Sequence, residues 1–266
     1  MQITPGTRAF VTGASRGIGA ALSRALAERG AIVGLAARST DESATLAERL
    51  PGGPHHVIAC DVADTDSVRD AVATFADLAG GIDLLVVNAG ITHYGPYRRQ
   101  SLEDQLQMSE VNWHGTLRTV HFGLPYLLDR ANGHVVVVSS GAAMRSFPWA
   151  AVYGGTKGAQ RMFAEALRHE LSGTGVSLTT VYPGEIATNL HDHEKDTMPD
   201  WYRGGPGAAS ADELAQRVLR AIEHDDRAVW FPPIVRLLGV LHNADSRLAD
   251  ALLRRLRGGT AAPRRD

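Results

Sequence analysis

A glycine-rich loop near the N-terminus constrains the fold more than any other feature of the sequence. Arg8–Thr12 has the pattern of a short apolar strand, residues 13–19 follow with the spacing Gly-x-x-x-Gly-x-Gly, and residues 20–29 have the pattern of a helix. Glycine lets the backbone approach a phosphate closely, and a helix N-terminus offers unpaired N–H groups and a favourable dipole. Strand, loop and helix in this order predict a dinucleotide-binding unit, whereas the loop alone could be an ordinary tight turn.

Apolar runs and amphipathic helical patterns then alternate along the chain, without internal repeats. Strands buried on both faces of a parallel sheet appear in a sequence as continuous β-branched runs, and residues 135–138 are four valines. We expect the other strands at residues 31–37, 55–60, 82–87, 176–181 and 228–231, with helices between them. These helices include residues 40–50, residues 102–126, and a helix that starts at the capping box Ser210-Ala-Asp-Glu213 and ends near His224. The alternation predicts an α/β fold: a single doubly wound Rossmann-type domain with a central parallel sheet flanked by helices.

Two regions depart from this alternation. Residues 191–207 have no regular period, and a loop of this length in a compact domain is typical of a lid or binding loop. The chain after residue 233 is rich in leucine and arginine. We therefore expect a dinucleotide-binding and catalytic domain at residues 1–233, with a substrate loop at 189–209. A C-terminal helical extension with a disordered end is expected at 234–266.

The C-terminal extension is basic. From Arg247 onward six arginines face two aspartates, and residues 247–257 have the pattern of a leucine/arginine helix. A basic amphipathic helix can lie on a membrane surface. It can also cover the substrate pocket or a neighbouring subunit, or pack on its own domain. The sequence leaves these alternatives open.

Charge, cysteine content and hydropathy exclude several classes of protein. The formal net charge of −2 does not favour binding to nucleic acid. Cys60 is the only cysteine, no secretion signal opens the chain, and no apolar run approaches the roughly 18 residues of a membrane span. We therefore expect a cytoplasmic protein. Residues 191–194, His-Asp-His-Glu, lack a second ligand cluster at a known spacing, so we expect no metal site.

A tyrosine and a lysine follow the valine strand at a spacing that suits acid/base chemistry. Tyr153 and Lys157 are four residues apart on a predicted helix and should share one face, and Ser140 stands where the strand ends. A tyrosine hydroxyl titrates near pH ~10, and an ammonium group close by favours the phenolate. Ser140 could hold a substrate oxygen against that phenol. A bare Tyr-x-x-x-Lys is more often a core tyrosine beside a solvated charge, so the pattern needs support from the rest of the chain.

The end of the second predicted strand indicates which dinucleotide the chain binds. An acidic residue that would bond an adenosine ribose 2′-hydroxyl is expected there, but the strand closes with Arg38. Arg38, together with Arg16 in the glycine loop, suits a 2′-phosphate, which guanidinium groups bind bidentately. This pair favours NADP(H) over NAD(H). Asp61, after the third strand, could accept a hydrogen bond from the adenine amino group, unless an aspartate there serves only to cap a helix.

With these residues identified, the chain resembles the short-chain dehydrogenase/reductase family over roughly residues 8–231. The resemblance rests on the glycine loop, Asp61-Val62, Asn88-Ala-Gly90, Asn112, Ser140, Tyr153-Gly-Gly-Thr-Lys157, and Pro183-Gly184 with Thr188. Each piece is weak alone, but their order and spacing together are highly specific. Val87 and Glu185 depart from the family pattern, and Glu185 argues against a wholly apolar substrate pocket.

The resemblance implies a catalytic set of Asn112, Ser140, Tyr153 and Lys157. Tyr153 would be the acid/base, Lys157 would lower its pKa and hold the ribose, and Ser140 would orient the carbonyl. Asn112 would bridge a backbone carbonyl and a water, and so support a water relay behind Lys157. Thr188 would hydrogen-bond a nicotinamide amide. The family also implies a homodimer or homotetramer.

The expected contacts fall into two groups. The cofactor would be bound by Gly13, Ser15, Arg16, Gly17, Ile18, Gly19, Arg38, Asp61, Val62, Asn88, Ala89, Gly90, Tyr153, Lys157, Pro183, Gly184, Ile186 and Thr188. The substrate pocket would be lined by His93, Tyr94, Phe147, Glu185, His191, Met198 and Trp201.

The leading hypothesis is an NADPH-dependent oxidoreductase that acts on the ketone or secondary alcohol of a medium-sized, partly apolar substrate. One alternative is a reductase of carrier-bound 3-oxoacyl groups, which would need a basic patch at the pocket mouth that residues 191–207 hardly supply. Two others are a non-catalytic NADP-binding sensor and a membrane-surface protein whose function lies in the basic tail.

Overall fold

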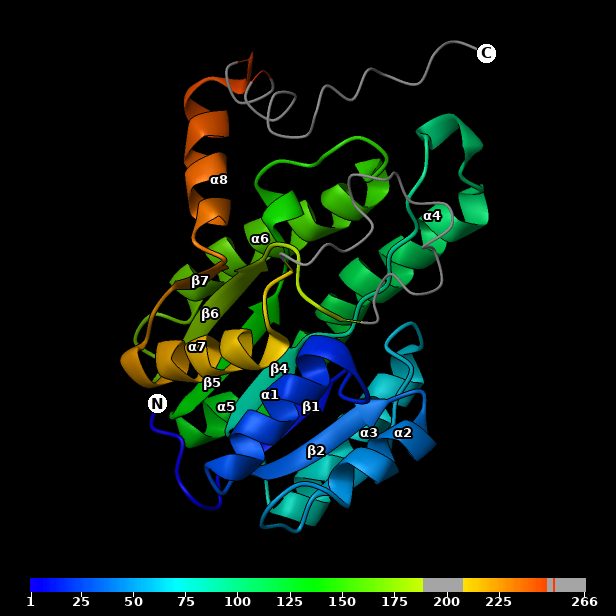
Figure 1. Cartoon of the computed structure of the whole chain (residues 1–266). Helices are drawn as coiled ribbons and strands as arrows, with labels where there is room; N and C mark the ends of the chain where they lie inside the picture. Colours follow the sequence, from blue (N-terminus) through cyan, green and yellow to red (C-terminus); the bar gives the residue numbers. More distant parts are fainter. Residues whose placement is uncertain (189–207, 248–250, 252–266) are drawn as a thin grey trace.

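The computed structural model describes residues 1–188, 208–247 and 251 of the chain. Its described part contains one parallel sheet with the strand order β3-β2-β1-β4-β5-β6-β7. The strands are β1 Arg8–Thr12, β2 Ile32–Ala37, β3 His56–Ala59, β4 Leu84–Val87, β5 Gly133–Val138, β6 Val176–Pro183 and β7 Ala228–Phe231. Figure 1 shows the strands side by side with helices around them. The predicted doubly wound parallel α/β fold is confirmed.

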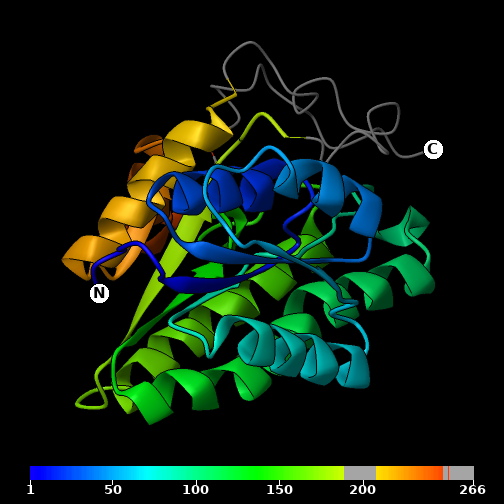
Figure 2. The same ribbon diagram turned by 90° about the horizontal axis from the view of Figure 1, so that it is seen from below.

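Helices cover both faces of the sheet. They are α1 Gly17–Glu28, α2 Thr40–Ala47, α3 Thr65–Ala79, α4 Leu102–Met108, α5 Gly115–Arg130, α6 Ala151–Glu170, α7 Ala211–His224 and α8 Ile234–Ala244. One core cluster joins the sheet to α1 and α7, and a second joins it to α3, α5 and α6. Figure 2 shows the sheet between these two layers. Alternate valines of β5 belong to alternate clusters, as expected of a strand buried on both faces.

Three segments differ from the expected pattern. The helix predicted over residues 102–126 contains a π-helical turn, Ser109–His114, and extends to Arg130. The helix predicted over residues 40–50 ends at Ala47. The apolar run at residues 234–241 is helical despite Arg236, because the guanidinium group lies on the exposed side of α8. Of the leucine/arginine helix expected at 247–257, only Arg247 and Ala251 lie among the described residues.

The strand order determines where the cleft lies. The direction of chain progression across the sheet reverses between β1 and β4, which are neighbours in the sheet although β2 and β3 lie between them in sequence. Loops leave the carboxyl ends of these two strands in opposite directions and open a crevice, which is where ligands bind in open α/β sheets. The glycine loop after β1 and the segment starting at Asn88 after β4 meet there.

A partly buried group of charges lies at the amino ends of β1 and β4, opposite the cleft. Asp83 accepts hydrogen bonds from the backbone N–H and from Nε of Arg8, at 3.0 and 2.7 Å, and pairs with Arg130 at 3.1 Å. Burial alone would raise the pKa of the Asp83 carboxyl, but the hydrogen bonds and charge of Arg8 outweigh it and the pKa is lowered. The carboxylate therefore stabilises the folded state above its ordinary pKa.

We expect Asp83→Ala to lower the free energy of unfolding by about 3 kcal/mol, because it leaves two guanidinium groups without their shared partner. Urea unfolding at neutral pH measures this change. Asp70→Ala is the matched control, since Asp70 pairs with Arg69 at the exposed surface and should cost less than about 1 kcal/mol. Equal losses in the two variants would contradict the importance of the Asp83 cluster.

Candidate active site

The glycine loop is built so tightly that side chains are excluded. Gly13 has a φ of +65°, and a Cβ there would lie 2.8 Å from the Cα of Ala89. Gly17 has a φ of +58°, and a Cβ at Gly19 would collide with the carbonyl oxygen of Gly13. Helix α1 starts at Gly17 and no side chain caps its N-terminus. Its first N–H groups therefore face the crevice, as a pyrophosphate site requires.

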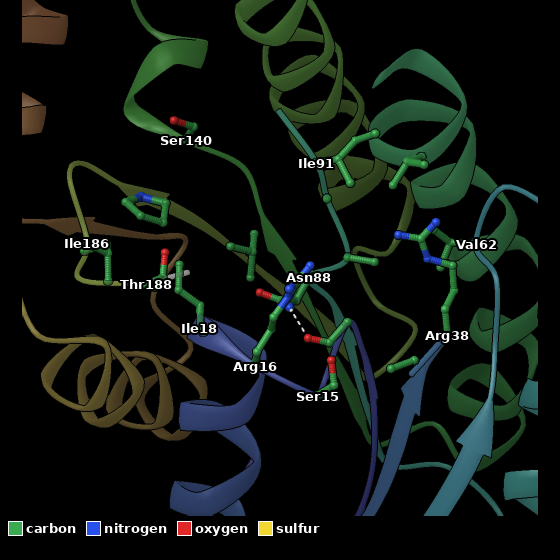
Figure 3. Close-up of a pocket in the computed structure, with 18 of the residues that line it drawn as sticks. Ser15, Arg16, Ile18, Arg38, Val62, Asn88, Ile91, Ser140, Ile186 and Thr188 are labelled. Atoms are coloured by element: carbon green, nitrogen blue, oxygen red, sulfur yellow. Dashed lines mark hydrogen bonds between the residues drawn. The ribbon is translucent and has the colours of Figure 1, made fainter. Parts of the chain in front are cut away.

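Asn88 joins the two strands at which the sheet order reverses. Its Nδ2 donates to the carbonyl oxygens of Thr12, at 3.0 Å, and of Gly13, at 3.2 Å. The Oγ1 of Thr12 in turn accepts from the backbone N–H groups of Asn88 and Ala89. These bonds hold the ends of β1 and β4 together, and Asn88 itself lines the cleft (Figure 3).

Lys157 lies one turn after Tyr153 on α6, and both side chains reach the cleft. Lys157 is 4% exposed, its Nζ donates to the carbonyl oxygen of Val138 at 3.1 Å, and the same atom lies 5.8 Å from the centre of the Tyr153 ring. Burial lowers the pKa of Lys157 from its ordinary value of 10.5 to about 7. The Oγ of Ser139 donates to the backbone oxygen of Lys157 at 2.9 Å, which ties α6 to the end of β5.

Ser140 stands at the carboxyl end of β5, directly before the 3-10 turn Gly141–Ala143. Its Oγ accepts a hydrogen bond from the N–H of Ala142 at 3.1 Å. Among the described residues its hydroxyl proton has no acceptor, so it can be donated to another oxygen in the cleft.

Asn112 is fully buried in the π-helical turn and does not line the cleft. Its Oδ1 accepts from the N–H of Ile91 at 2.8 Å, and its Nδ2 donates to the oxygen of Ile91 at 2.9 Å and to Oγ1 of Thr156 at 3.1 Å. A bond to a backbone carbonyl is therefore present, and the second hydrogen of the amide nitrogen goes to Thr156. A Cβ at Gly90 would lie 3.2 Å from Asn112 Oδ1 and 3.5 Å from Lys157 Nζ. The side chains of Asn112 and Lys157 therefore both approach this glycine.

Gln160 was not anticipated from the sequence. It is 0% exposed on α6, and its Nε2 donates to the backbone oxygen of Asn112 at 2.9 Å and to Oγ1 of Thr116 at 2.7 Å. Thr116 donates to the same Asn112 oxygen at 2.7 Å. The backbone oxygen of Asn112 in the π-helical turn thus accepts hydrogen bonds from two side chains. A glutamine three residues after Lys157 on the inward side of the helix was the signal available in the sequence.

The residues expected to bind the cofactor come together in one cleft. All of them line it except Gly19, which packs under the loop. Ser140 lines the same cleft, as do residues that the sequence did not indicate, namely Ala37, Ser39, Glu42, Cys60, Ile91, Val111, Val138 and Ser139. The cavity volume is about 290 Å³. This is close to the lower end of small-molecule pockets, about 300–1,000 Å³.

Two arginines flank one end of this cleft. Figure 3 shows Arg16 rising from the glycine loop and Arg38 from the end of β2, with Ser15 between them in this view. Both guanidinium groups are exposed to solvent. Glu42, in the first turn of α2, lines the cleft as well and adds a negative charge to its lining.

Asp61 lines the cleft and has a local hydrogen bond. Its Oδ1 accepts from the N–H of Ala63 at 3.0 Å. The cap of α3 is a different aspartate, Asp64, whose side chain accepts from the N–H of Ser67. The capping role that competed with ligand binding therefore belongs to Asp64.

The structure describes four of the seven residues expected in the substrate pocket. The rings of Tyr94 and Phe147 pack 5.8 Å apart, and the Tyr94 ring lies edge-on to Tyr153 at 5.9 Å. His93, whose Nε2 lies 3.3 Å from Oε1 of Gln107, and Glu185 do not line the cleft, and neither do Tyr94 and Phe147. The remaining three, His191, Met198 and Trp201, lie outside the described residues.

Among residues 1–188, 208–247 and 251, no group of three or more potential metal ligands lies together. None of the helices in that part of the chain combines the length and the apolar character needed to cross a bilayer.

Comparison with known proteins assigns the family. The family model described as short chain dehydrogenase matches residues 7–199. The chain belongs to the short-chain dehydrogenase/reductase family. A glycine betaine reductase, ATRR, of Emericella nidulans is 34% identical over 226 residues, covering 83% of this chain and 18% of that protein. The resemblance to this family of oxidoreductases, seen first in the sequence motifs, is confirmed.

Solved structures of the family share the fold. An alcohol dehydrogenase from the archaeon Thermococcus sibiricus, complexed with 5-hydroxy-NADP, is 28% identical, with a TM-score of 0.73 and coverage of 85% of this chain and 95% of that chain. A short-chain dehydrogenase/reductase from Burkholderia phymatum in complex with NAD is 24% identical, with a TM-score of 0.83 and coverage of 93% and 96%. The second likeness concerns the fold alone.

Proposed function

We propose that this short-chain dehydrogenase/reductase is an NADPH-dependent oxidoreductase that interconverts a ketone and a secondary alcohol. The observation that carries the proposal is a single cleft with a glycine loop and arginines at one end and Tyr153, Lys157 and Ser140 at the other. The loop excludes side chains as a pyrophosphate site requires, so the cleft fits a dinucleotide. When bound, a nicotinamide cofactor supplies or accepts the hydride.

The side chains of the chain itself manage the proton and the substrate oxygen. Tyr153 is the acid/base: its hydroxyl gives a proton to the carbonyl oxygen in reduction and takes one from the alcohol in oxidation. Ser140 donates a hydrogen bond to the same oxygen and orients it. Lys157 lies against the Tyr153 ring, so its charge lowers the pKa of the phenol. A phenolate would in turn raise the pKa of Lys157, so the two groups titrate as a coupled pair.

The arginines are the reason for proposing NADP(H). Arg38 occupies the place where a carboxylate would bond a ribose 2′-hydroxyl, and Arg16 lies on the same cleft. Two guanidinium groups suit the 2′-phosphate. Of the two solved structures with this fold, the archaeal alcohol dehydrogenase is complexed with an NADP derivative and the Burkholderia phymatum protein with NAD, so the choice rests on the two arginines.

A ketone panel tests the proposed function. Purified protein with NADPH should oxidise the cofactor, followed by its absorbance, in the presence of at least one medium-sized, partly apolar ketone. A protein that binds NADPH tightly but reduces no ketone of the panel would be a non-catalytic sensor, and the proposed enzymatic function would be wrong.

We also propose where the protein is located and how it assembles. We place the protein in the cytoplasm, as a homodimer or homotetramer. Met162 on α6 is 64% exposed and Leu128 on α5 is 38% exposed, which leaves apolar surface on two neighbouring helices for a second copy to cover. Sedimentation velocity would give the assembly state.

The low pKa of Lys157 predicts how stability depends on pH. The unfolded chain keeps this proton until pH ~10.4, whereas the folded protein loses it above about pH 7. The unfolded state therefore binds more protons between these values, and stability rises with pH across this window, by about 1 kcal/mol per pH unit from this group. Urea unfolding of the cofactor-free protein should show this rise, and Lys157→Met should remove it. Parallel curves for the two proteins would contradict the assignment.

Gln160→Met should lower kcat about 10-fold with little change in the KM for NADPH. The substitution should displace Tyr153 slightly, and a small displacement of a catalytic group lowers the rate strongly. Gln160 positions Asn112, which holds Thr156, and Thr156 donates to the backbone oxygen of Tyr153 at 2.8 Å. The kinetic pKa that reports Tyr153 should also shift in this variant. Gln216→Met, at a half-exposed site of α7 outside the cleft, is the control. A lower melting temperature with an unchanged pH–rate profile would mean that Gln160 is only structural.

A further inference from the structure

Arg118, on α5, connects two segments that are far apart in the sequence. Its Nε donates to Oγ1 of Thr65 at 3.0 Å, and one Nη donates to the backbone oxygen of Val62 at 3.3 Å. The same Nη donates to the backbone oxygen of Glu110 at 3.4 Å, and the other Nη donates to Oε2 of Glu110 at 2.9 Å. The guanidinium group thus bridges the turn after β3 and the π-helical turn Ser109–His114.

Both of these segments contribute side chains to the lining of the cleft. Asp61 and Val62 line it from the turn after β3, and Val111, directly after Glu110, lines it from the π-helical turn. Val62 and Val111 are buried and belong to the core cluster that joins the sheet to α3, α5 and α6. Arg118 itself does not line the cleft. It can therefore act on a ligand only through the residues that it holds.

The turn after β3 is also fixed by packing on α5. A Cβ at Gly115 would lie 2.9 Å from the Cβ of Val62 and 3.2 Å from its backbone oxygen, so Val62 lies directly against the helix. Gly115 precedes Arg118 by three residues, which places both on the same side of α5. The glycine lets the turn approach the helix, and the arginine holds the backbone oxygen of the turn there.

The ion pair with Glu110 keeps the guanidinium group of Arg118 in place at neutral pH. The Arg118 side chain is 21% exposed and that of Glu110 is 44% exposed. The hydrogen bond from Arg118 holds the pKa of the Glu110 carboxyl below its usual range, so this carboxyl is charged at neutral pH. An arginine suits this position, because its planar guanidinium group presents several N–H donors in a fixed arrangement and a lysine does not.

The turn after β3 stands at the end of the cleft opposite Ser140. The N–H of Cys60 donates to the backbone oxygen of Ala37 at 3.1 Å, so this turn leaves the sheet beside the end of β2. Figure 3 shows Val62 and Arg38 on one side of the cleft and Ser140 on the other. In the proposed complex with NADPH, the side with Arg38 receives the adenosine half, because Arg38 is proposed to bind the 2′-phosphate of that half.

We propose that Arg118 is a positioning residue for the adenosine half of the cofactor, because it holds Val62 and Val111 in place at that end of the cleft. The two valines present apolar surface to the adenine. The inference rests on the proposed function only in that the cleft binds a nicotinamide dinucleotide, and it does not depend on the substrate. Asn112, next to Val111, has its own side-chain hydrogen bonds, so the loss of Arg118 should leave the chemical step intact.

Binding of ADP, which contains the adenosine and the phosphates that NADPH and NADH share, tests the role of Arg118. Arg118→Met should weaken ADP binding, measured by calorimetry, about 10-fold, because the turn after β3 loses the hydrogen bonds that hold it. The KM for NADPH should rise by a similar factor. The kcat at saturating NADPH should change by less than about 2-fold, since only binding is affected.

Arg168→Met is the matched control. Arg168, on α6, also donates to backbone oxygens of other segments, those of Leu178 at 3.2 Å and Arg227 at 2.9 Å, but it does not line the cleft. Its loss should lower the melting temperature and leave ADP binding unchanged. Circular dichroism checks that the variants fold. If Arg118→Met does not fold, Thr65→Val removes a single bond to Arg118 and should weaken ADP binding about 3-fold.

Three results would overturn the inference. These are unchanged ADP binding in the folded variant, equal weakening of ADP binding by Arg118→Met and Arg168→Met, and a fall in kcat with an unchanged KM for NADPH. The second would make Arg118 a structural residue only. Failure of the proposed function gives a different result: a wild type that binds ADP but reduces no ketone refutes the reductase and leaves the ADP result for Arg118 standing. A wild type that binds neither ADP nor NADPH refutes both.

Discussion

Tyr153→Phe is expected to lower kcat about 1,000-fold while NADPH still binds with nearly unchanged affinity. The substitution removes only the hydroxyl that exchanges the proton, and general acid–base groups typically contribute about 10²–10⁴-fold. The ring remains packed against Tyr94, so the shape of the site is kept. Steady-state kinetics on a ketone found in the panel, together with a fluorescence titration of NADPH, measures both quantities.

Tyr182→Phe is the matched control for that experiment. Tyr182 is a buried tyrosine on β6 that stacks on Trp230 at 4.2 Å and does not line the cleft. Its loss of a hydroxyl should change kcat by less than about 3-fold. Turnover of Tyr153→Phe within about 10-fold of the wild type would exclude Tyr153 as the acid/base.

Arg38→Asp is expected to reduce the preference for NADPH over NADH, measured as the ratio of kcat/KM values, by about 100-fold. A charge-assisted hydrogen bond to the 2′-phosphate is lost, and a carboxylate now repels that phosphate. With NADH the same carboxylate can accept from the ribose hydroxyl, so activity with NADH should rise. Kinetics with both cofactors on one ketone gives the ratio.

The control for cofactor choice is Arg220→Asp, which makes the same charge change on an exposed site of α7 outside the cleft. Its ratio should stay close to that of the wild type. An unaltered preference in Arg38→Asp would mean that the 2′-phosphate does not bind at Arg38. In that case Glu42, which lines the same cleft, would be the residue to vary next.

The elements that carry local signals were predictable from the sequence. Strand β1 has the predicted bounds, because an apolar run ends abruptly at a glycine loop. The capping box at Ser210 starts α7, where Ser210 accepts from the N–H of Glu213 at 3.3 Å. Tyr153 and Lys157 share a helix face because their spacing is close to one turn. Such features depend on neighbouring residues, so one sequence is enough to find them.

Features that depend on contacts distant in sequence were not predictable. At the π-helical turn, Gln160 donates to the backbone oxygen of Asn112, and the side-chain amide of Asn112 bonds Ile91 and Thr156. These partners come from two other segments of the chain. The length of α8 depends on packing against Met144 and Gly141, which no local pattern reveals. The substrate-pocket assignments of His93 and Glu185 stay predictions, because three of the residues expected beside them lie outside the described part of the chain.

The central claim is that this cleft transfers a hydride while Tyr153 transfers a proton. The most direct test is to incubate the protein with NADPH doubly deuterated at nicotinamide C4 and a ketone panel, and to analyse the products by mass spectrometry. The account predicts a secondary alcohol that carries one deuterium on its carbinol carbon, formed by the wild type and nearly absent with Tyr153→Phe. A protein that binds NADPH yet transfers deuterium to no ketone would contradict it.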